Sequence, residues 1–150
     1  MVEGERDQQL VGYWSDQPLY QGAMEGADVA FRADGTGWMY WSRSGGPFEV
    51  VRFGWHTRTD RQLAIGLRQQ LSGTWHLVGQ AVRHRVLDQA ALTESIAVTY
   101  DISAGQDAIR EPATVLTLSQ RLRLGTIGDR FAYQRALGPS EDDPATIRRR

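Results

Sequence analysis

Cysteine is absent from this chain of 150 residues, and so is lysine, since all 17 basic residues are arginine. Without cysteine the chain has no disulfide, no thiolate zinc site and no cysteine nucleophile, so its stability must come from packing. Without lysine it has no amine for a Schiff base and no P-loop lysine. The lack of cysteine fits a reducing compartment, and we expect a cytoplasmic protein.

Long apolar runs and an excess of charge are also absent. No segment approaches the ~18 to 20 apolar residues that span a bilayer, and residues 1–9 lack the basic start and apolar run of a signal peptide. The formal net charge is -1, so no sustained positive field attracts nucleic acid. The expected partners therefore include neither a membrane nor nucleic acid, whereas a homodimer is left open.

Side chains that could hold a metal ion or attack a substrate are few. The three histidines are His56, His76 and His84, and no His-x-His or His-Glu-x-x-His spacing occurs. No Gly-x-Ser-x-Gly motif marks a nucleophilic serine. We therefore expect no metal site and no cofactor.

The apolar residues alternate with period two nearly everywhere, and glycine, aspartate and proline interrupt them at short intervals. This pattern is typical of an antiparallel barrel or sandwich. Asp34-Gly35 between two alternating segments is a strong hairpin signal. The pattern predicts one domain over 1–137, and the charged tail 138–150 is predicted to be disordered. The clearest predicted strands lie near 9–15 and over 27–32, 36–43, 48–57, 61–71, 94–103, 113–124 and 129–137.

The segment 75–92 is ambiguous. Val78, Val82, Val86 and Ala90 recur at four-residue spacing, which is compatible with a short helix over 78–90. The residues from Val82 to Val86 also alternate as in a strand. A strand over 82–88 is the favoured interpretation.

The first predicted strand contains Gly12-Tyr13-Trp14, and the last one contains Arg135. A Gly-x-Trp on the first strand with an arginine on the last resembles the calycins, the family of lipocalin-like proteins. The resemblance implies an all-β, antiparallel up-and-down barrel of about 8 to 10 strands. It also implies that Trp14 closes one end, that Arg135 stacks on its indole for about 0.5 to 2 kcal/mol, and that the open end holds a small apolar ligand.

Side chains alternate between the two faces of a strand, so the more apolar parity predicts which of them face the lumen. The predicted lumen is mostly apolar with a few polar groups, which is the composition of a small-molecule pocket. The alternative is a barrel filled by its own side chains. Strand by strand, the residues assigned to the lumen are Glu49, Val51, Phe53 and Trp55; Leu63, Ile65, Leu67, Gln69 and Leu71; Val82, His84 and Val86; Glu94, Ile96, Val98, Tyr100 and Ile102; Leu116, Leu118, Gln120, Leu122 and Leu124; and Phe131, Tyr133 and Arg135.

The first functional hypothesis is an intracellular lipocalin-like protein that binds a small, mostly hydrophobic or aromatic metabolite in the barrel cup. Trp41 is included among its contacts because it lies on the opposite face of its strand from Trp38 and Tyr40. The predicted ligand-binding residues are Trp55, Phe53, Tyr100, Tyr133, Gln120 and Trp41.

Two alternatives belong to other functional classes. One is a cofactor-independent enzyme, such as a cyclase or isomerase of secondary metabolism, that uses His84, Glu49 or Glu94 as acid or base in the same cup. For these three residues a structural histidine and two solvated rim carboxylates are the competing interpretation. The other is a protein-interaction module with a filled barrel and exposed aromatic residues.

Overall fold

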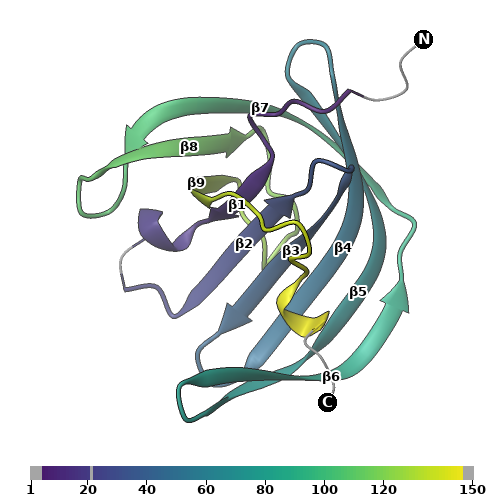
Figure 1. Cartoon of the computed structure of the whole chain (residues 1–150), viewed down its shortest axis with the longest axis vertical. Helices are drawn as coiled ribbons and strands as arrows, with labels where there is room; N and C mark the ends of the chain where they lie inside the picture. Colours follow the sequence, from purple (N-terminus) through teal and green to yellow (C-terminus); the bar gives the residue numbers. More distant parts are fainter. Residues whose placement is uncertain (1–4, 21, 147–150) are drawn as a thin grey trace.

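The computed structural model describes residues 5–20 and 22–146. Within these residues the chain forms nine antiparallel strands and two short 3-10 helices (Figure 1). In the same part of the chain, no helix has the length and apolar character needed to cross a membrane. In chain order the elements are β1 (Gly12–Ser15), η1 (Gln17–Leu19), β2 (Glu25–Phe31), β3 (Thr36–Arg43), β4 (Pro47–Arg58), β5 (Gln62–Val78), β6 (Ala81–Ala91), β7 (Ser95–Gln106), β8 (Pro112–Leu118), β9 (Arg130–Arg135) and η2 (Pro144–Thr146).

Eight of the described strands close into a ring. Their order is β4-β3-β2-β1-β9-β8-β7-β5, and β4 pairs with β5 to complete the circle. Strands that follow one another in the chain are neighbours round most of this ring. The predicted all-β, antiparallel up-and-down barrel is therefore confirmed.

β6 lies outside the ring, beside the second half of β5. β5 pairs with β7 over residues 62–66 and with β6 over residues 69–78. β6 and β7 thus run in the same direction along one edge of β5, one after the other. The strand favoured over 82–88 is confirmed and is longer than predicted.

One extra residue in β5 decides which of its side chains reach the lumen. The β4–β5 pairing shifts between Arg52, which pairs with Gln69, and Phe53, so Arg68 forms a β-bulge. Because side chains alternate along a strand, one inserted residue moves every later side chain to the other face. The lumen positions predicted for Gln69 and Leu71 are therefore wrong, and Leu71 is buried in a separate cluster on the outer face.

The predicted strand 113–124 ends early, at Leu118. Arg123 and Ile127 form an isolated bridge around a tight turn, in which Gly125 has a φ of +84°. Leu124 lies in this turn and is 91% exposed, so its predicted lumen position is wrong. Leu122 is buried in the core as predicted.

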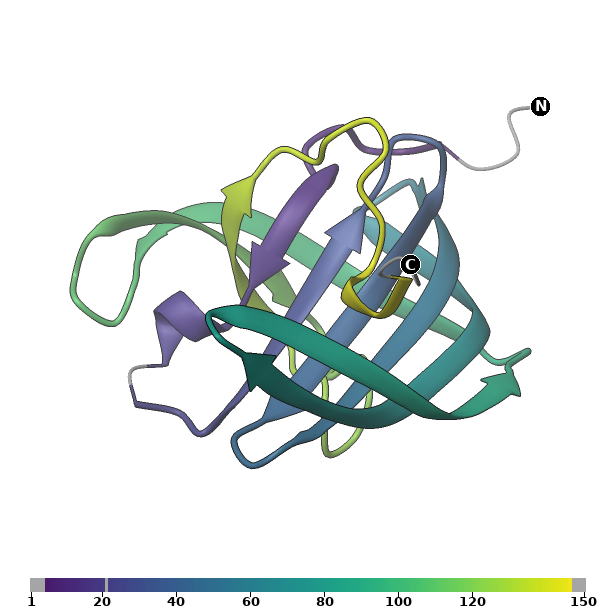
Figure 2. The ribbon, with the colours of Figure 1, turned by 60° about the horizontal axis from the view of Figure 1, so that its bottom comes forward.

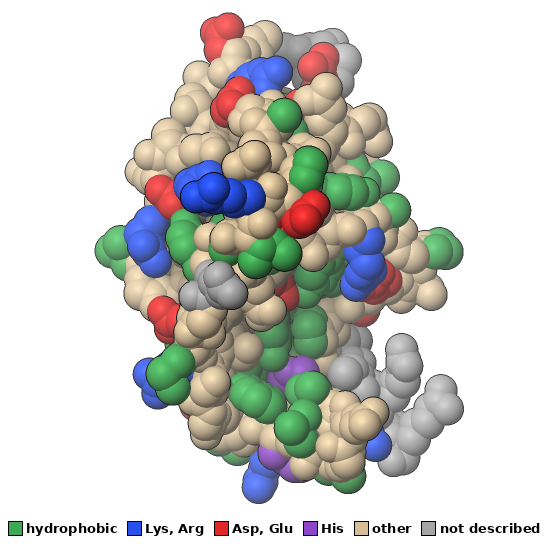
Figure 3. Space-filling view, turned by 90° about the vertical axis from the view of Figure 1, so that its left-hand side faces the viewer, with side chains coloured by type: hydrophobic (Ala, Val, Ile, Leu, Met, Phe, Trp, Pro, Cys, Tyr) green, Lys and Arg blue, Asp and Glu red, His purple; other side chains and the backbone are tan. Residues whose placement is uncertain are grey.

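A second hydrophobic cluster covers the outer face of β1–β4. The β5–β6 hairpin crosses this face (Figure 2), and hydrophobic and histidine side chains gather on the side of the molecule seen in Figure 3. The lumen positions predicted for Val82, His84 and Val86 are wrong, because β6 has left the ring and packs its more apolar side on this cluster. Its members are Ala30, Trp38, Phe48, Val50 and Leu71, with Tyr13, Tyr40, Trp75, Val86, Leu137 and Ala145 packed against them.

The segment that follows β9 lies across the same outer face (Figure 1). Three consecutive acidic residues each pair with an arginine from a different part of the ring, and Asp143 is only 2% exposed. This packing of 138–146 differs from the disorder predicted over 138–150, of which 147–150 lie outside the described residues. The pairs are Glu141 with Arg135 at 2.6 Å, Asp142 with Arg32 at 3.0 Å, and Asp143 with Arg52 at 2.7 Å.

The three signature residues Gly12, Trp14 and Arg135 do not act as one unit. Gly12 has a φ of +144°, and a Cβ there would lie 2.6 Å from the ring of Tyr133. Trp14 faces the lumen, whereas the guanidinium of Arg135 lies 4.7 Å from the ring centroid of Tyr13 on the outer face. The predicted stacking of Arg135 on Trp14 is therefore wrong, because a register shift between β1 and β9 pairs Arg135 with Tyr13.

Gly37→Ala is expected to lower the free energy of unfolding by about 1 to 3 kcal/mol, as overpacking does. A Cβ at this position would lie 2.2 Å from the carbonyl oxygen of Ala30 and 2.7 Å from the ring of Phe53. Gly66→Ala is the matched control, because nothing lies within 4 Å of its Cβ position, and its effect should stay within about 0.5 kcal/mol. Chemical denaturation, monitored by tryptophan fluorescence, measures the free energy of unfolding of both variants. Equal effects would contradict the packing described for β3.

Candidate functional site

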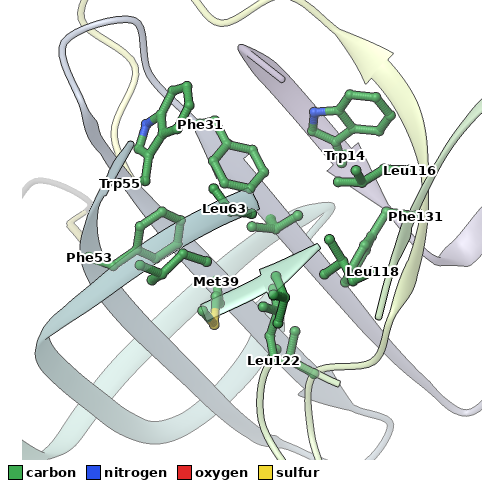
Figure 4. Packing of buried hydrophobic residues seen from close by; sticks show 14 of the residues in the cluster. Trp14, Phe31, Met39, Phe53, Trp55, Leu63, Leu116, Leu118, Leu122 and Phe131 are labelled. Carbon is green, nitrogen blue, oxygen red and sulfur yellow. The ribbon is translucent and has the colours of Figure 1, made fainter. Parts of the chain in front are cut away.

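The lumen, where the ligand was predicted to bind, is packed with the protein's own side chains. Residues from opposite walls of the barrel meet in one hydrophobic cluster (Figure 4). An eight-stranded barrel is just wide enough for its side chains to fill it. The largest buried members of this cluster include Trp14, Phe31, Met39, Phe53, Trp55, Leu63, Ile65, Leu116 and Phe131.

Two of the predicted ligand contacts direct their polar atoms to the protein itself. The indole nitrogen of Trp55 donates to the carbonyl oxygens of Arg32 at 3.0 Å and Thr36 at 3.2 Å. The hydroxyl of Tyr100 donates to the Asp7 carboxylate at 2.6 Å. Burial, followed by the interaction with Asp7, raises the pKa of Tyr100 above its ordinary value. The protein therefore already satisfies the polar atoms of these two predicted ligand contacts.

Side chains also cover both ends of the lumen. At one end Leu122 enters the core, and Arg123 pairs with Glu49 at 3.1 Å. At the other end Leu10 packs into the same core, and its carbonyl oxygen accepts a hydrogen bond from Trp14 Nε1 at 2.9 Å. Trp14 and Leu122 mark the two ends in Figure 4. Glu49, predicted as an acid or base, is thus held in an ion pair.

The remaining predicted site residues do not meet in one place. Glu94 and Gln120 are exposed, and Tyr133 is 39% exposed. Trp41 is half-buried against the core, and its indole nitrogen donates to Glu25 at 3.2 Å. The structure therefore brings Phe53, Trp55 and Tyr100 together in a closed core and leaves the other predicted contacts apart.

His84 points to a different place, on the outer face of the barrel. It comes from β6, yet its ring lies 4.8 Å from Phe48 of β4 and 5.6 Å from Tyr40 of β3, measured between ring centroids. These contacts curl the β5–β6 hairpin over the outer face of β1–β4, as Figure 2 shows. We use the name outer groove for the region where the β5–β6 hairpin packs against this face. Its polar residues are Tyr13, Asp28, Tyr40 and His84, and its apolar residues are Phe48, Trp75, Leu77, Val82 and Val86.

Tyr13 and Asp28 form the first polar pair of the outer groove. The hydroxyl of Tyr13 on β1 donates a short hydrogen bond to the carboxylate of Asp28 on β2. Burial raises the pKa of Asp28, while hydrogen bonds from Ser15 and Tyr13 oppose that shift. Burial, followed by the charge of Asp28, raises the pKa of Tyr13. The tyrosine therefore keeps its proton at neutral pH.

Tyr40 and His84 form the second polar pair. Tyr40 lies directly opposite Asp28 in the β2–β3 pairing, and its hydroxyl lies 2.8 Å from Nε2 of His84. Burial lowers the pKa of His84, and the charge of Asp143 opposes that shift. Burial also raises the pKa of Tyr40. A neutral imidazole thus faces a neutral phenol, and the tautomer of His84 decides which of them donates the hydrogen bond.

Each pair leaves one buried atom without a hydrogen-bond partner among the described residues. These atoms are Oδ1 of Asp28 and Nδ1 of His84. A buried polar atom without a partner costs about 1 to 3 kcal/mol, which a bound molecule or water can recover. The outer groove therefore combines apolar walls with two unused hydrogen-bonding atoms.

Comparison with known proteins adds no relative. No family model, no curated protein and no solved structure matches this chain. Within residues 5–20 and 22–146, no three histidine, aspartate or glutamate side chains are grouped so that they could hold a metal ion. The site must therefore be interpreted from its own geometry.

His84 was a predicted site residue, whereas the neighbouring pair of Tyr13 and Asp28 was not predicted. Asp28 interrupts the apolar segment 27–31 and shares its outer face with Ala30, so an acidic residue facing a buried surface was the available signal. Tyr40 was assigned to an aromatic cluster rather than to a polar one. Its pairing with His84 needs the curl of the hairpin, which no local pattern specifies.

The contribution of His84 to the stability of the protein should decrease as the pH falls below about 6.5. The pKa of His84 is lower in the folded protein than its ordinary value of 6.5, so the unfolded chain binds the proton more tightly. His84→Gln should reduce this pH dependence, since it removes the shifted group while keeping a partner for Tyr40. Denaturation at several pH values between 7 and about 5 measures it. His76→Gln, which removes an exposed histidine, is the control, and equal slopes in the two variants would contradict the burial of His84.

Proposed function

We propose that this chain is a calycin-like barrel that binds a small, mostly hydrophobic molecule in the outer groove. The observation that carries the proposal is the pair of unused buried atoms, Oδ1 of Asp28 and Nδ1 of His84, beside an apolar wall. Ligand sites are typically apolar with a small number of placed polar groups. The outer groove has this composition, whereas the polar groups of the lumen are bonded to the protein.

The polar atoms indicate which chemical group the ligand carries. Oδ1 of Asp28 accepts hydrogen bonds while its carboxyl is ionised, and Nδ1 of His84 donates or accepts according to the tautomer. A hydroxyl group can serve both atoms, because it donates one hydrogen bond and accepts others. We therefore expect an uncharged ring compound with at least one hydroxyl group.

The apolar wall sets where the rest of the molecule lies. Trp75 pairs with His84 across the hairpin, and the next pair on the same face is Leu77 with Val82. Leu77 is 60% exposed and Val82 is 44% exposed. Covering such side chains with a ligand contributes about 25 cal/mol for each Å² of apolar surface removed from water. This wall supports a hydrophobic ligand over a polar one.

The resemblance to the calycins stays part of this proposal. The closed ring of antiparallel strands, with Gly12 and Trp14 on the first of them, supports it. We do not place the ligand in the lumen, because Phe53, Trp55 and Tyr100 lie in the packed core. The proposed ligand is thus of the class first expected, in a different place.

One observation favours a second candidate, an enzyme that moves a proton within its substrate. His84 has a lowered pKa and an unpartnered Nδ1, and it is hydrogen-bonded to Tyr40. A neutral histidine with a free nitrogen is suited to act as a general base, and a tyrosine can return the proton. This candidate uses His84 as predicted, on the outer face rather than in the cup.

Binding in the outer groove can be tested with 2-naphthol, an uncharged aromatic compound with one hydroxyl group. We expect saturable binding to the purified chain, with shifts of the Trp75 and His84 ring signals in NMR spectra. Leu77→Asp should weaken binding about tenfold or more, because a charge on the apolar wall is costly to desolvate.

Val78→Asp is the matched control for this titration. Val78 is the next residue of the same hairpin and is 53% exposed, but it lies on the opposite face of β5. The Val78→Asp variant should bind 2-naphthol with the same affinity as the unmodified chain. Equal losses in the two variants, or shifts confined to lumen residues, would contradict a ligand site in the outer groove.

The enzyme candidate has its own test. Compounds that co-purify with the chain can be extracted, identified by mass spectrometry and returned to it in deuterated water. A proton-transferring enzyme should incorporate deuterium into such a compound, and His84→Gln should abolish this incorporation. Binding without incorporation would leave the first proposal intact and exclude the second for that compound.

A further inference from the structure

A hollow on another face of the barrel is lined by arginine side chains. It lies over the outer faces of β4, β5 and β7 and has a volume of about 630 Å³. Its basic residues are Arg6, Arg58, Arg68 and His56, and the only carboxylate among its described lining residues is that of Asp34. This hollow shares no lining residue with the outer groove.

Small residues make the floor of this hollow. Gly54 and Gly66 are directly opposite each other in the β4–β5 pairing, and Ser95 of β7 follows on the other side of Gly66. No atom lies within 4 Å of the Cβ position of Gly66. The floor is thus open at Gly66, where backbone is exposed. A planar group can lie on such a surface in van der Waals contact.

The arginine side chains border this floor. The guanidinium of Arg68 lies over Gly54, where a Cβ would be 2.5 Å from its Nη2. The guanidinium of Arg6 lies over Gly35 in the same way, because a Cβ added at Gly35 would be 2.5 Å from Nε of Arg6. Both guanidinium groups therefore contact the barrel surface, and both residues remain exposed to solvent.

Asp34 offsets part of the positive charge of these arginines, because its carboxylate lies near enough to Arg6 for the arginine to lower its pKa. Among the described residues, no carboxylate forms an ion pair with Arg6, Arg58 or Arg68, whereas five other arginines are so paired. Arg58 Nε lies 3.4 Å from Nε2 of His56, which is another basic group. The hollow therefore concentrates positive charge in a chain whose net charge is -1. Such a site attracts an anion.

The geometry points to a binding site for a small phosphate monoester whose phosphate meets Arg58 and Arg68 and whose ring lies on the open floor at Gly66. A phosphate dianion offers several acceptor oxygens to more than one guanidinium, and such charge-assisted hydrogen bonds are strong. A hollow of about 630 Å³ exceeds what the phosphate alone requires and leaves room for a ring. This site is separate from the proposed site in the outer groove and does not depend on it.

The site can be tested by titrating phenyl phosphate into the full, 15N-labelled chain at low salt. We expect saturable shifts of the backbone amides of Gly54, Gly66 and Ser95, and weaker binding of inorganic phosphate, which lacks the ring. Arg68→Gln and Arg58→Gln should each weaken phenyl phosphate binding about tenfold, as the loss of one charge-assisted hydrogen bond does.

Two further variants make the result decisive. Arg61→Gln removes an exposed arginine that is paired with Asp101 and lies outside the hollow, so it should change nothing. Gly66→Leu places a side chain on the open floor and should abolish the preference for phenyl phosphate over inorganic phosphate.

Three results would overturn this inference. The first is equal weakening by Arg61→Gln and Arg68→Gln, which would show nonspecific attraction. The second is the absence of shifts at the three floor amides at millimolar phenyl phosphate. The third is benzoate binding as tightly as phenyl phosphate, which would show that the site does not select phosphate.

Discussion

The β-bulge at Arg68 is the constraint on which most of the structure depends. β5 is long enough to belong to two packing units, and one inserted residue switches its apolar side from the lumen to the outer face. Before the bulge, Leu63, Ile65 and Leu67 fill the barrel, and after it Leu71 and Trp75 pack outside. Without that switch the β5–β6 hairpin would present its polar side to β3 and β4, and neither the second cluster nor the outer groove would form.

A packed lumen moves the surfaces available for binding to the outside of the barrel. Trp55 and Tyr100 use their polar atoms within the protein, and side chains cover both ends of the lumen. The outside then offers two sites of contrasting chemistry. The outer groove holds neutral tyrosine and histidine side chains beside an apolar wall, whereas arginine side chains line the second hollow. Molecules of different charge would therefore be distributed between them.

The segment after β9 is held to the barrel by ion pairs and brings a charge close to the outer groove. Its three acidic residues pair with arginines on separate parts of the ring, and Asp143 is buried in its pair with Arg52. Exposed ion pairs contribute little, but a buried carboxylate that loses its partner is strongly destabilising. The charge of Asp143 also reaches His84, where it acts against the effect of burial on the pKa. The end of the chain thus belongs to the electrostatics of the proposed site.

Local pattern alone predicted an antiparallel barrel or sandwich, the position of most strands, and the lumen-facing side of Phe53, Trp55 and Tyr100, because alternation and turn residues act over a few positions. It could not determine the inserted residue at Arg68 or the register shift that pairs Arg135 with Tyr13, since a bulge leaves the alternation of each half unchanged. Only the tertiary structure placed His84 beside Tyr40 and Phe48, and Arg58 and Arg68 around one hollow. These neighbours come from strands that meet only when the ring closes and the hairpin curls over it.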